Sequence, residues 1–123
     1  MIHEEICTYE VCKLAKEKGF NEYAEAFYAE NCDIAHSQGP EKWNEYKDRY
    51  AAPTQSLLQR WLREEKKIEV YVRNFEKTTN FSYHYWNFIT DGNGKTLKVG
   101  NKMFDTYELA LEDALAYSLK NLI

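Results

Sequence analysis

The stretch from Pro53 to Val72 constrains the fold of this chain more than any other part of the sequence. Its first half carries apolar residues at helical spacing, namely Leu57, Leu58, Trp61 and Leu62. Its second half alternates in the manner of a half-buried strand, with apolar residues at Ile68, Val70 and Val72. Pro53 suits the first turn of the helix, because the N–H that proline lacks would have no partner there. The stretch therefore predicts one helix that runs directly into one strand.

The rest of residues 53–123 predicts two more strands and a last helix. Residues 81–90, FSYHYWNFIT, have the aromatic content of a central strand, and Asp91-Gly-Asn-Gly94 is a strong hairpin turn. A third strand is expected at 95–99. In the last helix Asp105 is predicted as the N-cap, with Glu108 as its capping-box partner. We expect an α+β fold, in which a three-stranded antiparallel meander carries helices packed on one face.

Residues 1–52 are expected to form a helix-rich, acidic and variable part of the same single domain, which spans 1–123. Thr8 is predicted to cap a helix over 9–18 that Gly19 ends. Residues 21–31 fit either a helix or a short strand around 26–28, and aromatic residues within 41–50 recur at helical spacing. Between these segments, residues 37–40 have the composition of a turn.

The composition fits one soluble domain of 123 residues. The sequence has no apolar run of about 18 residues, which a membrane-spanning helix requires. Its first residues lack the pattern of a secretory signal. Three cysteines without a CxxC pair favour reduced thiols over a disulfide framework. We therefore expect a cytoplasmic protein that makes no contact with a membrane.

The charge is unevenly distributed along the chain. Residues 1–50 contain 6 Lys and Arg against 11 Asp and Glu, whereas residues 51–123 contain 10 against 9. An acidic half disfavours broad binding to a phosphate backbone. The element order expected for 53–123 also occurs in double-stranded-RNA-binding domains, which place basic residues at the start of the last helix. This chain has Asp105 and Glu108 there, so nucleic acid is the less favoured partner.

Three segments of the chain resemble a known family, namely KLAKEKGF, APTQSLLQRWLREEKKIEV and FDTYELALEDAL. The family consists of short proteins encoded in phages and mobile elements of gut bacteria of the Bacteroides type. The resemblance covers about half of the chain, and the family has no assigned activity or catalytic residues. It implies an origin in a mobile element, and it favours a small accessory or interaction protein over a housekeeping enzyme.

Aromatic residues make up 15% of the chain, and a poorly patterned aromatic segment is typical of an interface. We therefore predict a non-enzymatic binding module whose partner is an unidentified protein. Self-association into a homodimer is also consistent with the sequence. The predicted contact residues are Tyr23, Phe27, Tyr28, Trp43, Tyr46 and Tyr50.

Two alternative functions stay open at this point. The aromatic sheet and its basic fringe form a candidate nucleic-acid surface, made of Arg73, Lys77, Tyr83, Tyr85, Lys95 and Lys98. Two Cys/His pairs at i, i+4 spacing form a candidate zinc site, made of His3, Cys7, Cys32 and His36. No motif places a base or an oxyanion hole beside a cysteine. We therefore predict no catalytic residues, no enzymatic activity and no cofactor.

Overall fold

The computed structural model describes residues 4–76, 83–100 and 102–123. Its elements are α1 (Tyr9–Glu17), β1 (Ala24–Ala29), β2 (Ile34–Glu41), the 3-10 turn η1 (Trp43–Glu45), β3 (Arg49–Ala51), α2 (Gln55–Glu65), β4 (Ile68–Glu76), β5 (Tyr83–Asp91), β6 (Thr96–Val99) and α3 (Tyr107–Asn121). Two antiparallel sheets have the strand orders β2-β1-β3 and β4-β5-β6. The predicted α+β class and the predicted meander, which is β4-β5-β6, are confirmed.

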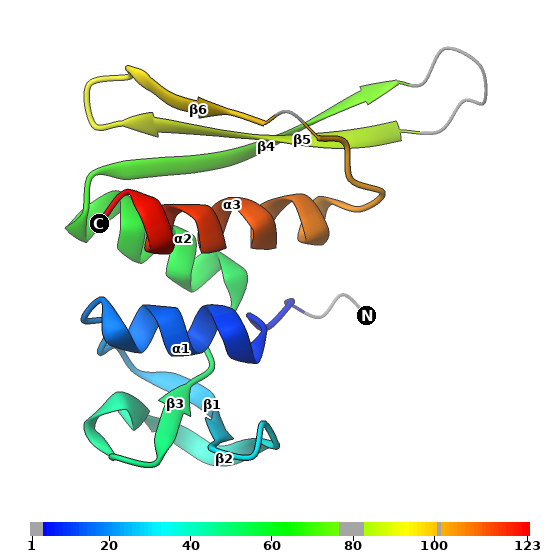
Figure 1. The fold of residues 1–123 in the computed structure, drawn as a ribbon. Helices are drawn as coiled ribbons and strands as arrows, with labels where there is room; N and C mark the ends of the chain where they lie inside the picture. Colours follow the sequence, from blue (N-terminus) through cyan, green and yellow to red (C-terminus); the bar gives the residue numbers. More distant parts are fainter. Residues whose placement is uncertain (1–3, 77–82, 101) are drawn as a thin grey trace.

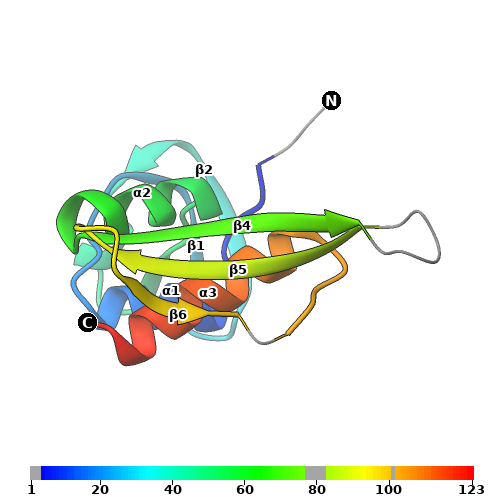
Figure 2. The same cartoon turned by 90° about the horizontal axis from the view of Figure 1, so that it is seen from above.

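The elements form stacked layers (Figure 1). The sheet β4-β5-β6 is one outer layer, and α2 and α3 pack against one of its faces. Helix α1 lies on the other side of these helices and contacts α3 and β3, and the sheet β2-β1-β3 closes the opposite end. From above, no helix or strand of the described chain lies over the other face of β4-β5-β6 (Figure 2). One face of this sheet is therefore left uncovered.

Helix α2 runs into β4 as the sequence predicted, but it begins at Gln55, two residues later than Pro53 suggested. Thr54 is the N-cap, and its hydroxyl accepts a hydrogen bond from the N–H of Leu57 at 3.2 Å. Pro53 therefore precedes the cap instead of occupying the first turn. The helix ends before Lys67, whose φ of 58° turns the chain directly into β4.

Both predicted ends of α1 are confirmed. Thr8 caps its N-terminus, and Gly19 follows its C-terminus with a φ of 94°. The N–H of Phe20 donates to the carbonyl of Ala15 at 2.9 Å, and the N–H of Gly19 donates to Lys16 at 3.2 Å. This is the Schellman arrangement, and it turns the Phe20 ring onto Trp61 of α2, at 5.4 Å between ring centroids.

The expectation of a helix-rich first half is wrong, because residues 24–51 form the second sheet. Strand β1 pairs with β2 through Ala26 and His36, and with β3 through Phe27 and Ala51. Residues 37–40, expected as a turn, lie inside β2, and residues 41–50 contain the end of β2, the short turn η1 and the start of β3. The helical spacing of the aromatic residues there was misleading. Trp43 fills the core instead, and its indole N–H donates to the carbonyl of Ala24 at 2.7 Å.

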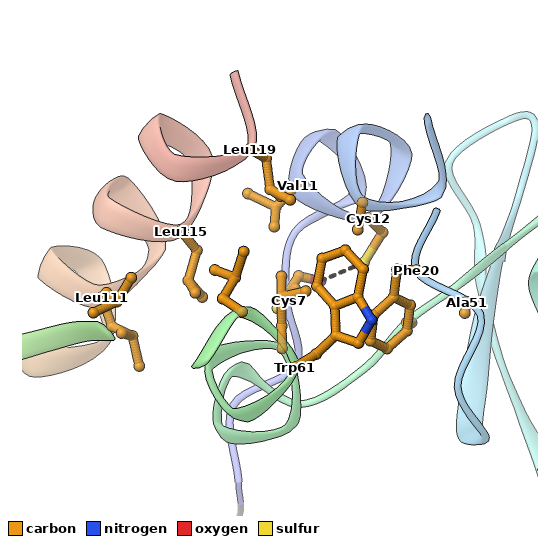
Figure 3. Packing of buried hydrophobic residues seen from close by; sticks show 14 of the residues in the cluster. Cys7, Val11, Cys12, Phe20, Ala51, Trp61, Leu111, Leu115 and Leu119 are labelled. Atoms are coloured by element: carbon orange, nitrogen blue, oxygen red, sulfur yellow. Dashed lines mark hydrogen bonds between the residues drawn. The ribbon is translucent and has the colours of Figure 1, made fainter. Parts of the chain in front are cut away.

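The buried side chains of both halves form one cluster (Figure 3). Cys7, Val11 and Cys12 approach Trp61 from the α1 side, and Leu111, Leu115 and Leu119 approach from α3. The Cys12 thiol donates a weak hydrogen bond to the carbonyl of Cys7 at 3.6 Å. These side chains exclude water from the centre of the molecule, which is the main source of its stability.

Glu112 of α3 joins all three helices. Its Oε2 accepts hydrogen bonds from the N–H and the hydroxyl of Thr8, at 2.9 and 2.7 Å. Its Oε1 accepts a hydrogen bond from the side-chain amide of Gln55 at 2.8 Å. The start of α3 lies nearby, and its N-cap is Thr106, whose hydroxyl accepts from Leu109 at 3.1 Å. The prediction of Asp105 as the cap is therefore wrong by one residue.

Asn87 fixes α3 beneath β5. This side chain is fully buried, and its Nδ2 donates to the carbonyl of Ala110 at 2.9 Å and to Asp113 Oδ2 at 3.0 Å. The N–H of Gly100 donates to the backbone carbonyl of Asn87 at 2.8 Å. A Cβ on Gly100 would lie 2.7 Å from that same oxygen, so the close approach of the chain after β6 requires glycine.

Candidate functional site

The uncovered face of the sheet β4-β5-β6 carries a continuous group of large side chains. Strand alternation turns Val70 and Ile89 toward the helices, where both are fully buried, and turns their neighbours outward. Residues on opposite strands then meet in register, as Tyr71 does with Phe88 and Arg73 with Trp86. We call this surface the outer sheet face; it consists of Glu69, Tyr71, Arg73, Trp86, Phe88, Thr90 and Val99.

Stacked rings form the centre of the outer sheet face. The rings of Tyr71 and Phe88 lie nearly parallel, with an interplanar angle of 14° and 5.2 Å between centroids. The guanidinium carbon of Arg73 lies 5.8 Å from each of the two centroids. Such contacts contribute about 0.5–1 kcal/mol each at an exposed site. They hold the three side chains in a flat layer that presents its surface to the solvent.

The outer sheet face exposes apolar side chains to the solvent. Val99, which pairs with Phe88, is 57% exposed. Tyr71 and Phe88 are half-buried, and within the part of the chain that the structure describes no helix or strand lies over this face of the sheet. A contiguous apolar patch on a sheet face is typical of an interaction site, because covering it removes further apolar surface from water.

The residues predicted for nucleic-acid binding do not share this face. Only Arg73 lies on it, whereas Lys98 points to the helices, with its ammonium 4.0 Å from the ring centroid of Tyr117. Tyr85 also lies on the helix side, where its ring meets Tyr107 edge to face at 6.3 Å. Lys95 is exposed in the turn between β5 and β6. Lys77 and the side chain of Tyr83 lie outside the described residues.

The sequence contained a signal for the outer sheet face that the choice of site residues did not use. Tyr71 alternates with Val70 and Val72, and Phe88 alternates with Ile89, so the period of two already separates the two faces. Which of the two aromatic faces the helices cover is not visible in that period. The selected tyrosine, Tyr85, belongs to the covered face.

Five of the six predicted contact residues of the middle segment fall into two clusters. In the first, the guanidinium carbon of Arg49 lies 4.7, 5.4 and 4.8 Å from the ring centroids of Phe27, Trp43 and Tyr46. Trp43 is only 4% exposed, whereas Tyr46 is 42% exposed. Tyr23 lies apart at the start of β1, is 60% exposed, and has the Lys42 ammonium 5.4 Å from its ring centroid.

The second cluster surrounds Tyr9 of α1. Its ring meets Tyr28 and Tyr50 edge to face, at 5.7 and 5.5 Å between centroids. The Tyr28 hydroxyl donates to the carbonyl of Cys7 at 2.8 Å, and burial raises the pKa of this phenol to about 12. These rings hold the second sheet against α1, so the middle segment does not present its six aromatic residues as one surface.

Lys16 of α1 organises the loop between η1 and β3. Its ammonium donates to the carbonyls of Tyr46 and Arg49, at 2.7 Å each. Burial lowers the pKa of this ammonium, because a charged group loses favourable hydration there. The arrangement serves the fold, since a lysine that carries several carbonyl bonds has few donors left for a ligand.

The three described residues of the candidate zinc site, Cys7, Cys32 and His36, are not brought together as one ligand set. Cys7 is fully buried, and burial raises the pKa of its thiol well above the usual value, which disfavours the thiolate that zinc requires. Cys32 and His36 are exposed, and His3 lies outside the described residues. Among residues 4–76, 83–100 and 102–123 no group of three or more His, Cys, Asp or Glu side chains is placed to hold a metal ion.

Compared with known proteins, the chain matches no protein-family model, no curated protein and no solved structure. Within the described ranges, no helix has both the length and the apolar character needed to cross a membrane. The function therefore has to be inferred from the side chains themselves, and the outer sheet face is the candidate site with the clearest geometry.

Proposed function

We propose that this protein is a non-enzymatic interaction module that binds a protein partner through the outer sheet face. One observation carries the proposal: stacked aromatic rings and an exposed valine lie on a sheet face that no other element of the described chain covers. We place the contact there rather than on the middle segment, because the rings of that segment already pack against Arg49 and Tyr9.

The area available fits a contact of moderate strength. Covering a further ~200–300 Å² of apolar surface would contribute roughly 5–8 kcal/mol before the costs of association. Those costs, from lost rotation, translation and side-chain freedom, amount to about 4–15 kcal/mol. The balance favours a reversible partner over a permanent one.

A protein fits the charges of this face better than a nucleic acid does. A surface for single strands combines aromatic rings with a groove of positive charge. Among the described residues of the outer sheet face, Arg73 is the single cation, and Glu69 lies on the same strand. Lys98, which the nucleic-acid hypothesis needs, is directed at Tyr117 and Asp113 on the helix side.

Origin and location are parts of the same proposal. The segments that resemble proteins of phages and mobile elements fit a small accessory protein whose role is to bind another protein. Cys7, Cys12 and Cys32 are all free thiols, which fits a reducing cytoplasm.

Site-specific photo-crosslinking tests the proposal in the organism that encodes the protein. A photo-crosslinking amino acid replaces Val99 on the outer sheet face, and in a matched control it replaces Lys13, an exposed residue of α1. We expect a discrete protein adduct from position 99 and none from position 13. Equal adducts from both positions, or none from either, would contradict the proposal. An adduct that nuclease digestion removes would overturn it in favour of nucleic acid.

A further inference from the structure

We propose that the partner on the outer sheet face is a second copy of this chain, in a two-fold, face-to-face dimer. In this dimer Glu69 of one protomer faces Arg73 of the other. The inference rests on the proposed function, because it uses the same surface and names its occupant.

The charges of β4 are arranged symmetrically about one aromatic residue. Glu69, Tyr71 and Arg73 are each two residues apart, so all three lie on the outer sheet face. At a rise of about 3.4 Å per residue, the two charged residues lie ~7 Å on either side of Tyr71 along the strand. A strand of this kind is complementary in charge to an antiparallel copy of itself.

The charges also select one of two possible symmetries. Face-to-face sheets are related by a two-fold axis that lies between them, either along the strands or across them. An axis along the strands would bring both copies of Glu69 to one level and both copies of Arg73 to another, where like charges repel. An axis across the strands at the level of Tyr71 and Phe88 reverses the strand direction. This axis places Glu69 of each protomer opposite Arg73 of the other, so the dimer contains two equivalent Glu69–Arg73 pairs.

Both charged groups are available for such a pair. Among the side chains that the structure describes, no carboxylate forms an ion pair with Arg73. Glu69 Oε1 forms a long ion pair with Arg63 Nη1 at 3.8 Å, which is beyond hydrogen-bond distance, and the Glu69 side chain is still 38% exposed and can accept a second cation. A bidentate pair with Arg73 of the second copy would satisfy both groups.

Pairing through the edge of β4 is the competing arrangement, and α2 interferes with it. The side-chain amide of Gln59 donates to the carbonyl of Val70 at 2.6 Å, so this backbone acceptor of β4 is already occupied. A second strand added beside β4 would have to displace Gln59. The sheet face, in contrast, needs no rearrangement before it is covered.

The area predicts a weak dimer. Three strands about 4.8 Å apart, over roughly five residues each, give a contact of ~250 Å² per protomer. This is below the ~800 Å² per partner of a standard stable interface. We therefore expect a dissociation constant of about 10–100 µM, so that the protein changes from monomer to dimer within an accessible concentration range.

Sedimentation equilibrium over about 5 to 500 µM tests the inference directly. We expect the mass to rise from the monomer value of 14.6 kDa toward twice that value. Arg73→Glu alone and Glu69→Arg alone should each weaken association by about tenfold or more. The double variant Glu69→Arg, Arg73→Glu should restore it, and an equimolar mixture of the two single variants should associate as a heterodimer.

Lys95→Glu is the matched control, because it makes the same charge change at an exposed residue of the β5–β6 turn. It should leave association unchanged, and near-ultraviolet circular dichroism should report a native fold for every variant. A wild-type protein that stays monomeric at the highest concentration would overturn the inference. So would a dimer that the Glu69 and Arg73 substitutions do not affect. If the protein stays monomeric but the photo-crosslinker at position 99 still joins it to a different protein, only the inference of a second copy would be overturned. The proposed function would stand.

Discussion

Cys7 and Cys12 lie fully inside the core, whereas Cys32 is exposed in the turn between β1 and β2. Burial raises the pKa of both core thiols, since the thiolate would lose its hydration there. A thiol reagent at neutral pH should therefore modify one cysteine quickly and the other two only after denaturant is added. Cys32→Ser should remove the fast phase. If two cysteines of the wild-type protein reacted quickly with the reagent, the result would contradict the packing around α1.

Alkaline pH should destabilise the protein, and Tyr28 shows why. The ordinary pKa of a tyrosine is 10.0, and burial raises the pKa of Tyr28 to about 12. The unfolded phenol therefore ionises first, so the contribution of Tyr28 to stability is complete below about pH 10 and is lost as the pH rises toward 12. Burial also raises the pKa values of the Cys7 and Cys12 thiols from the ordinary value of 9.0. The loss of stability therefore begins near pH 9. Lys16 opposes this trend, because burial lowers its pKa.

Urea unfolding between about pH 7 and pH 11 measures this dependence. The free energy of unfolding should be flat up to about pH 8.5 and should fall above pH 9. Tyr28→Phe should make the fall shallower above pH 10, because phenylalanine has no proton to lose. Identical profiles for the wild type and Tyr28→Phe would contradict the assignment.

At the scale of single elements, threonine begins all three helices, as Thr8, Thr54 and Thr106. Thr106 is the residue at which the structure differs from the sequence analysis, which predicted Asp105 as the cap of the last helix. Thr106→Ala should lower the free energy of unfolding by about 1 kcal/mol, because the N–H of Leu109 loses its acceptor. Asp105→Ala should cost less than about 0.5 kcal/mol, from the helix dipole alone. Chemical denaturation of the two variants compares them directly, and a larger loss for Asp105→Ala would favour the original assignment.

The elements that the sequence predicted correctly carry their own local signals. Gly19 ends α1 because it tolerates a φ of 94°, and Asp91 Oδ1 accepts from the N–H groups of Asn93 and Lys95 inside the hairpin turn. Strand β2 carries no comparable signal, because nearly all its residues are exposed and no apolar alternation results. Its register is set by pairing with β1, which is a contact between segments rather than a property of either one.

At the scale of the whole molecule, Glu112 makes the layers interdependent. Its carboxylate accepts from Thr8, which begins α1, and from Gln55, which begins α2. Glu112→Ala should lower the free energy of unfolding by about 2–3 kcal/mol, because bonds to a charged acceptor are among the stronger ones. Glu108→Ala is the control: this exposed side chain lies one turn earlier, and only its backbone carbonyl bonds Gln55. Equal losses for the two variants would contradict the role of Glu112.

The predicted site residues show where sequence reasoning stops. Strand alternation places Tyr85 and Trp86 on opposite faces of β5, since residues of opposite parity lie on opposite faces of a strand. It did not identify the covered face, because β5 is aromatic on both sides. The middle segment contains enough aromatic residues for an interface, yet Arg49 and Tyr9 already contact several of these rings within the chain.

The sequence by itself determined the α+β class, α1, the passage from α2 into β4 and the meander. Each of these depends on a cap, a turn or a period within a few neighbouring residues. Only the tertiary structure decided that residues 24–51 form a second sheet and that the Tyr71 and Phe88 face of β4-β5-β6 is left uncovered. Both outcomes depend on which distant segments pack together, and that choice is a property of the whole core.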